Sequence, residues 1–80
     1  MTSINSVKRK LRSYGMREAY TGSGVNILYC GYIAIRIIND YTVETWTVGE
    51  TLSGTINTYD TINQCNEAVL DMGLTGLQVI

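Results

Sequence analysis

The stretch from Val25 to Ile38, VNILYCGYIAIRII, decides the fold that we predict for this chain. Its β-branched and aromatic side chains favour extended backbone over helix. We therefore predict one long strand here, or two strands divided at Gly31. Apolar side chains occupy both alternating sets of positions, which is typical of a strand that is covered on both faces.

The two faces of this segment have similar hydrophobicity. In a single strand, alternate residues divide into Ile27, Tyr29, Ile33, Ile35 and Ile37 on one face and Leu28, Cys30, Tyr32, Ala34 and Ile38 on the other. Two short helices can cover only one of these faces. We expect the other face to be buried by a partner protein or by a second copy of the chain in a two-fold homodimer, because exposed apolar area favours association.

Two shorter strands are predicted after this segment. Asn39-Asp40 is a typical turn pair, and the alternation over Thr42–Val48 predicts a second strand. Gly49-Glu50 marks another turn, after which Leu52–Tyr59 forms a third strand. The threonines of this third strand suit the edge of a sheet, where the outer side remains in contact with water.

A helix is predicted after the third strand. Thr61 is placed to cap its first turn, and Gln64 three residues later completes a capping box. The apolar stripe of this helix consists of Ile62, Cys65, Val69 and Met72. We predict that Gly73 ends it, so that the helix covers residues 61–72, and that residues 77–80 form a short last strand.

Another helix is predicted at the N-terminus, over residues 3–14. Thr2 or Ser3 can cap it. Its apolar positions follow helical spacing and are Ile4, Val7, Leu11 and Tyr14. Gly15 can end the helix in a left-handed conformation, although residues 16–20 could instead continue it beyond a kink.

These elements predict a single domain, residues 1–80, of the α+β class. The order is helix, three strands, helix, which corresponds to a two-layer sandwich with a three-stranded antiparallel sheet and both helices on one face. This element order resembles that of double-stranded RNA-binding domains. That family recognises RNA through lysines at the start of its second helix, whereas residues 61–64 here are Thr-Ile-Asn-Gln, so the resemblance is confined to element order.

The sequence offers few residues for catalysis. It has no histidine and two cysteines, Cys30 and Cys65, which we expect to be small buried hydrophobic residues in a reducing, cytoplasmic compartment. Cysteines spaced 35 positions apart lack the paired spacing of a zinc site. We therefore predict no catalytic, metal-binding or cofactor-binding residues, and an enzyme with a cysteine nucleophile is our third hypothesis.

The charges are unevenly distributed along the chain. All six basic residues precede position 37, and six of the seven acidic residues follow it. We expect the basic cluster Lys8, Arg9 and Arg12 on the first helix to be exposed and to contribute to association rather than to folding. Such a cluster can contact phosphates, but the net charge of −1 is below the basic profile of nucleic-acid-binding domains, so nucleic-acid binding is our second hypothesis.

The aromatic residues favour a protein partner. The chain has six tyrosines and one tryptophan but no phenylalanine, and tyrosine and tryptophan are enriched at interfaces. Singly, Tyr14, Tyr29 and Trp46 could fill the core. As a set, aromatic side chains on the second face of the sheet can form a binding patch. With the basic cluster included, the predicted partner-binding residues are Lys8, Arg9, Arg12, Tyr32, Trp46 and Tyr59.

Our leading hypothesis is therefore a small, non-catalytic protein-binding module. The size and composition of the chain resemble those of small accessory proteins of bacteriophages and mobile elements, including anti-CRISPR inhibitors. That resemblance implies a chain that binds and inhibits a larger host protein. No stretch approaches the roughly 18 apolar residues of a membrane span, and no membrane partner or cofactor is expected.

Overall fold

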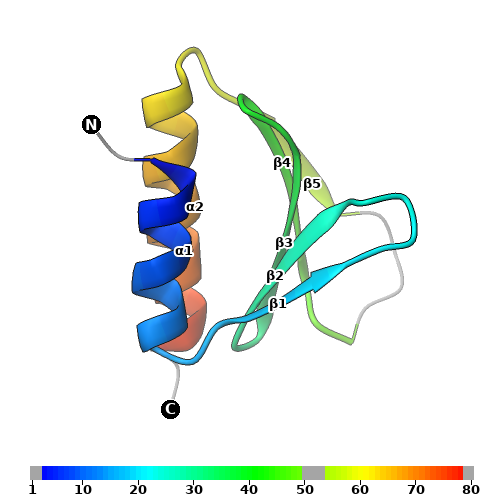
Figure 1. The fold of residues 1–80 in the computed structure, drawn as a ribbon, viewed down its shortest axis with the longest axis vertical. Helices are drawn as coiled ribbons and strands as arrows, with labels where there is room; N and C mark the ends of the chain where they lie inside the picture. The colour runs from blue at the N-terminus through cyan, green and yellow to red at the C-terminus, as the bar shows by residue number, and fades with distance from the viewer. Residues whose placement is uncertain (1–2, 50–53, 79–80) are drawn as a thin grey trace.

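The computed structural model describes residues 3–49 and 54–78. Within these residues the chain forms two helices and five strands, in the order α1 (Ile4–Ser13), β1 (Arg17–Tyr20), β2 (Asn26–Cys30), β3 (Ile33–Asn39), β4 (Thr42–Thr47), β5 (Thr55–Thr58) and α2 (Ile62–Leu77). The strands form one antiparallel sheet in which each strand pairs with the next along the chain, and both helices lie on the same side of it (Figure 1). The predicted α+β class and two-layer arrangement are confirmed, whereas the prediction of a three-stranded sheet is wrong.

Residues 25–38 form a hairpin rather than one long strand. Cys30 pairs with Ile33 across a two-residue turn, in which Gly31 has a φ of 63°. This positive φ suits the first position of a tight hairpin turn and favours glycine there. Because of this turn, the side chains of β3 lie on the opposite faces from those predicted for a single continuous strand. The residues that share the helix-facing side are Leu28 and Cys30 of β2 with Ile33, Ile35 and Ile37 of β3.

The edge strand β1 occupies the residues over which the first helix could alternatively have continued. Helix α1 ends at Ser13, and Gly15 follows with a φ of 105°. Residues 17–20 then pair with β2, and a loop over residues 21–25 connects the two strands. Arginine, glutamate and alanine favour helix in isolation, so the pairing with β2 decides the conformation of this segment.

The last two strands agree in position with the prediction and differ in length. Strand β4 covers Thr42–Thr47, close to the predicted 42–48. Strand β5 covers Thr55–Thr58, inside the predicted third strand, whose residues 52–53 lie outside the described residues. The pairing of β4 with β5 is continued by a hydrogen bond of 2.8 Å from the Tyr59 N–H to the Tyr41 carbonyl oxygen.

Both helices begin at the predicted caps. The Ser3 hydroxyl oxygen accepts a hydrogen bond of 3.1 Å from the backbone N–H of Ser6, and the Thr61 hydroxyl oxygen accepts one of 3.0 Å from that of Gln64. Each cap satisfies one of the N–H groups that a helix start leaves without an intrahelical partner. Neither described helix combines the length and the apolar composition needed to cross a membrane.

Helix α2 continues past Gly73 to Leu77, so the prediction that Gly73 ends it is wrong. Gly73 and Gly76 are both buried within the helix. A Cβ atom at Gly76 would overlap the carbonyl oxygen of Cys30, and one at Gly31 would overlap the carbonyl oxygen of Gly76. These glycines therefore let α2 approach the β2–β3 hairpin closely. The predicted last strand is wrong at Leu77, which is helical, and residues 79–80 lie outside the described residues.

The core lies between the helices and the sheet. Its fully buried side chains are Val7, Leu11, Leu28, Cys30, Ile35, Val43 and Val69, with Cys65 almost as well covered. Both cysteines are free and buried, as predicted. Burial raises the pKa of the Cys30 thiol to about 11 and also raises that of Cys65, so both thiols are neutral at pH 7. Each behaves as a small hydrophobic side chain.

The glycine contact between α2 and the hairpin can be tested by substitution. We expect Gly76→Ala to reduce the free energy of unfolding by about 1–3 kcal/mol, because the added methyl group overlaps the Cys30 backbone. Alanine is otherwise the better helix former, so a purely local effect would have the opposite sign. Urea denaturation of both variants measures the difference. Gly22→Ala is the control, since nothing lies within 4 Å of its Cβ position, and it should change stability by less than about 0.5 kcal/mol.

Candidate functional site

One face of the sheet, which we call the open face, points away from both helices (Figure 1). The strand registers place two rows of side chains on it. The first row runs across all the strands and consists of Ala19, Ile27, Arg36, Glu44 and Ile56. The second row consists of Arg17, Tyr29, Ala34 and Trp46. The open face therefore combines aliphatic, aromatic and charged side chains.

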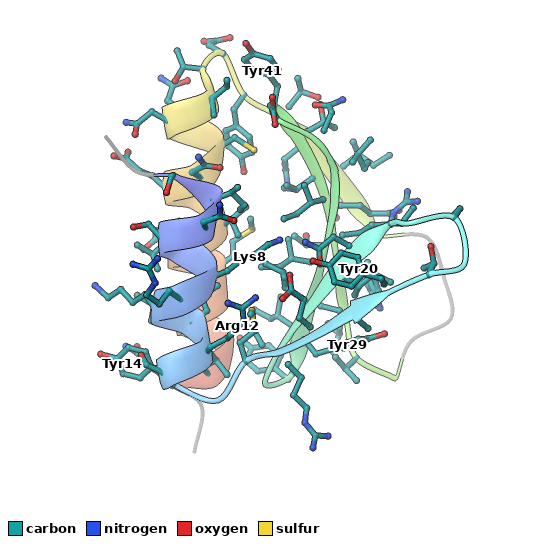
Figure 2. All side chains as sticks on the ribbon, viewed as in Figure 1. Lys8, Arg12, Tyr14, Tyr20, Tyr29 and Tyr41 are labelled. Carbon is teal, nitrogen blue, oxygen red and sulfur yellow. The ribbon has the colours of Figure 1, made fainter. Side chains whose placement is uncertain are left out.

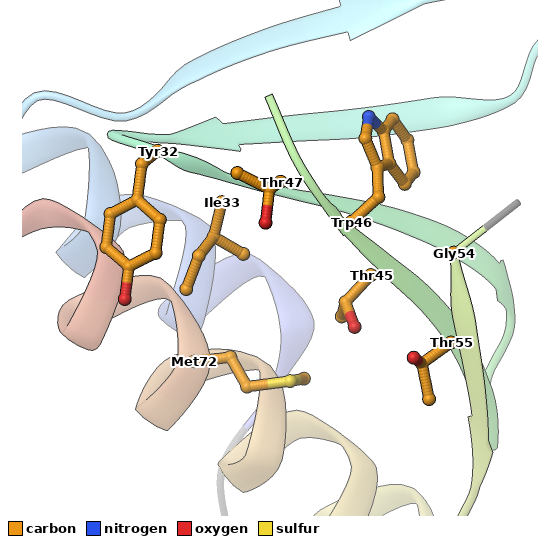
Figure 3. Close-up of a pocket in the computed structure, with 8 residues that line it drawn as sticks. All are labelled: Tyr32, Ile33, Thr45, Trp46, Thr47, Gly54, Thr55 and Met72. Atoms are coloured by element: carbon orange, nitrogen blue, oxygen red, sulfur yellow. The ribbon is translucent and has the colours of Figure 1, made fainter. Parts of the chain in front are cut away.

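The second row is centred on two aromatic rings. Trp46 extends from the side of β4 opposite to Thr45 and Met72, and so lies on the open face (Figure 3). Ala34 lies between Tyr29 and Trp46 in the register and is fully buried, although no helix covers this face. The larger side chains around Ala34 therefore cover it. Tyr29 itself is 36% exposed, so its ring is available for contact.

The first row has an ion pair at its centre. Arg36 and Glu44 lie directly opposite each other on β3 and β4, and the Arg36 Nη2 atom is 2.8 Å from the Glu44 Oε1 atom. The Glu44 side chain is 15% exposed and that of Arg36 is 38% exposed. A guanidinium group has several N–H donors, so Arg36 can hold Glu44 and still donate to a bound molecule.

The aliphatic residues of the first row flank this ion pair. Ile56 of β5 is 59% exposed, among the most exposed large apolar side chains described, and Ile27 of β2 is half-buried. Arg17 and Arg36 carry positive charge on the open face, while Glu44 is mostly buried. The open face thus combines exposed apolar side chains with two guanidinium groups.

The structure does not bring the predicted aromatic patch together. Of Tyr32, Trp46 and Tyr59, only Trp46 lies on the open face. Tyr32 is 43% exposed in the turn between β2 and β3. Tyr59 packs against the core, and burial together with the nearby Cys65 raises the pKa of its hydroxyl. The reason is the alternation of strand residues, which places positions 57 and 59 on the helix-facing side.

The basic cluster on α1 is not a set of three free cations, so the prediction that all its members are exposed is wrong. Lys8 and Arg12 point from α1 toward β1 and both pair with Glu18 (Figure 2). The Lys8 Nζ atom is 2.9 Å from the Glu18 Oε2 atom, and the Lys8 side chain is 12% exposed. Arg12 is about half exposed, and Arg9 is exposed. Pairing with Glu18 therefore reduces the charge that this helix offers to phosphates.

Glu18 is the acidic residue around which this contact forms. Burial alone would raise its pKa. Hydrogen bonds from Lys8, Arg12 and Asn26, together with the charge of Lys8, outweigh burial and lower the pKa of the carboxyl group from 4.5 to about 2. Glu18 is thus ionised at neutral pH and joins α1 to the edge strand β1.

Two clefts lie between the helices and the sheet. One of about 340 Å³ separates α2 from β4 and is lined by Tyr32, Ile33, Thr45, Thr47 and Met72 among others (Figure 3). The other, of about 270 Å³, lies near the start of both helices and is largely apolar. It contains Cys65, whose raised pKa makes the thiol a weak nucleophile at neutral pH. The open face remains the better candidate for binding, because its exposed residues are aromatic and charged.

Sequence reasoning identified only part of the open face. From the sequence, Trp46 is expected in a binding patch, and Tyr29 is expected on one face of the long strand or in the core. Arg36, Glu44 and Ile56 were not selected. Alternation within each strand could have placed them on one face, but only after the turn at Gly31 had been assigned correctly.

Comparisons of this chain with protein-family models, with curated proteins and with solved structures found no match.

The contact around Glu18 makes a prediction about stability and pH. We expect Glu18→Gln to reduce the free energy of unfolding at pH 7 by about 1–3 kcal/mol, because Lys8 then loses its charged partner at a largely buried position. A lowered pKa contributes stability above the unfolded value of 4.5, and this stability is lost as the pH falls toward 2. Urea denaturation at several pH values should therefore show the difference between wild type and variant shrinking from pH 5 to pH 2.

Asp71→Asn on the exposed side of α2 is the matched control. It should change stability by less than about 0.5 kcal/mol at pH 7. A difference between wild type and Glu18→Gln that stays constant down to pH 2 would contradict the ion-pair explanation.

Proposed function

We propose that this chain is a non-catalytic protein-binding module and that the open face is its docking surface. The observation that carries this proposal is the position of Tyr29, Trp46 and Ile56 on a sheet face that neither helix covers (Figure 1). Aromatic side chains at the centre of an interface contribute much of the binding energy in protein complexes. Apolar side chains left on one face of a small domain are typical of an interaction surface.

The charges of the open face support a partner that carries an acidic group. Arg17 is exposed, and Arg36 has donors beyond those that hold Glu44. A partner surface with an apolar centre and a carboxylate opposite Arg36 would match both features. The acidic partner carboxylate would then share the guanidinium group with Glu44.

The mode of action that we propose is occlusion of a site on a larger host protein. A chain of this size covers a functional surface by binding, without any chemistry of its own. This is the behaviour implied by the resemblance in size and composition to phage accessory proteins such as anti-CRISPR inhibitors. Binding of nucleic acid through α1 is the weaker proposal, because Lys8 and Arg12 already pair with Glu18.

Truncation of the two aromatic side chains on the open face tests the proposal. We expect Tyr29→Ala and Trp46→Ala each to weaken partner binding by about 2 kcal/mol, or roughly 30-fold, as for aromatic residues at interface centres. The tagged chain and its variants are used to recover proteins from the source cell, with and without nuclease, and the dissociation constant is then measured with the purified partner. Circular dichroism verifies that each variant is folded.

Tyr14→Ala and Tyr41→Ala are the matched controls, since both tyrosines are exposed and lie off the open face. Their binding should equal that of the wild type. Equal affinity of the open-face variants and the controls would refute the assignment of the docking surface. Loss of the partner after nuclease treatment would favour the nucleic-acid hypothesis instead.

A further inference from the structure

The two edges of the sheet differ in how they are protected against pairing with another strand. Edge strands in folded proteins usually carry charges, proline or a bulge that discourage such pairing. Strand β1 carries the charged residues Arg17 and Glu18. Strand β5 has the sequence Thr-Ile-Asn-Thr, which contains neither charge nor proline, and its pairing with β4 is regular. The β5 edge therefore lacks these protective features.

The backbone of β5 directs hydrogen-bonding groups away from β4 at two alternate positions. The Tyr59 N–H donates to Tyr41, which marks residue 59 as a hydrogen-bonded position of the β4–β5 ladder. Hydrogen-bonded and non-hydrogen-bonded pairs alternate in an antiparallel ladder, so Asn57 and Thr55 also bond toward β4. The N–H and C=O groups of Ile56 and Thr58 then point outward, away from the sheet.

We propose that a second copy of this chain pairs its β5 antiparallel to this strand, with the two-fold axis at Asn57. In this register Ile56 of each copy lies opposite Thr58 of the other. Both outward residues of each copy then exchange N–H···O=C bonds across the interface. The two sheets become one continuous sheet.

The side chains of β5 are compatible with this register on both faces. On the helix-facing side, Asn57 lies opposite Asn57 of the second copy in a non-hydrogen-bonded pair, where the amide of one can donate to the oxygen of the other. Helix α2 packs mainly on β2, β3 and β4, and Asn57 is half-buried. On the open face, the exposed side chain of Ile56 reaches its copy diagonally across the axis.

A second copy fits this edge better than an unrelated strand because the edge is complementary to itself. The register that uses both outward residues within β5 is symmetric about Asn57, so one sequence supplies both partners. The edge is uncharged and the net charge of the whole chain is only −1, so repulsion between copies is small. This inference does not depend on the proposed function, since it uses the edge of the sheet and leaves Tyr29 and Trp46 of each copy free.

Disulfide trapping tests the register. Asn57→Cys should form a disulfide-linked dimer under mild oxidation, because Cα atoms of a non-hydrogen-bonded pair lie about 4.5 Å apart, within disulfide range. Thr55→Cys is the matched control on the same strand and face. Its two copies would lie four residues apart in register, roughly 13 Å, which is too far for a disulfide. Cys30 and Cys65 are buried and should not interfere. Equal cross-linking of both variants, or cross-linking of Thr55→Cys alone, would overturn the register.

Sedimentation equilibrium tests the dimer itself. The wild-type chain should be a dimer at high micromolar concentration, and Thr58→Pro should be a monomer because proline removes an outward N–H that the β4–β5 ladder does not use. If circular dichroism shows that Thr58→Pro is unfolded, Ile56→Lys blocks the same edge with a charge and should also be a monomer. Trp46→Ala should remain a dimer. A monomeric wild type, or a dimer that is lost in Trp46→Ala and retained in the edge variants, would overturn the proposal.

Discussion

The contact on which the fold depends is the close approach of α2 to the β2–β3 hairpin. Gly76 lies against the Cys30 carbonyl group, and Gly31 in the hairpin turn lies against Gly76 in return. Backbone therefore meets backbone at this point, and no side chain separates the two layers. Earlier in the same helix, Gly73 lies against the Leu11 side chain and the Cys30 sulfur, so that these two glycines together bring α2 close to the sheet and to α1.

This placement of the helices determines what remains uncovered. Helix α2 contacts β2, β3 and β4, and α1 lies beside α2 on the same side of the sheet (Figure 1). Nothing among the described helices reaches the other face, so Tyr29, Trp46 and the Arg36–Glu44 pair stay at the surface. Strand β5 extends beyond the strands that α2 covers most closely. The helical layer is smaller than the sheet. The open face and the edge at β5 are both left uncovered by the helices for this reason.

The charged side chains form more contacts within the molecule than their distribution along the sequence suggests. Glu18 binds Lys8 and Arg12, which joins the first helix to the first strand, and Glu44 binds Arg36 across two strands. Each pair contains one carboxylate that is mostly buried, and such a group must be paired in the folded state. The basic N-terminal half of the chain is therefore only partly available to an external partner.

Local sequence determined the elements that depend on local physics. The caps at Ser3 and Thr61, the burial of both cysteines, the strand at 42–47 and the α+β class all follow from capping chemistry and from the periodicity of apolar residues. The patterns that predict these features involve residues a few positions apart. They could be predicted without knowledge of the rest of the chain.

Tertiary structure decided what depends on contacts between distant residues. Residues 17–20 are a strand because they pair with β2, despite their helical propensity, and α2 passes through Gly73 because glycine there faces Leu11 rather than ending the helix. The open face could not be predicted correctly, since the turn at Gly31 exchanges the faces of the two strands that it joins. Alternation within one strand is local, but which side of that strand meets the helices is set only by the packing of the whole chain.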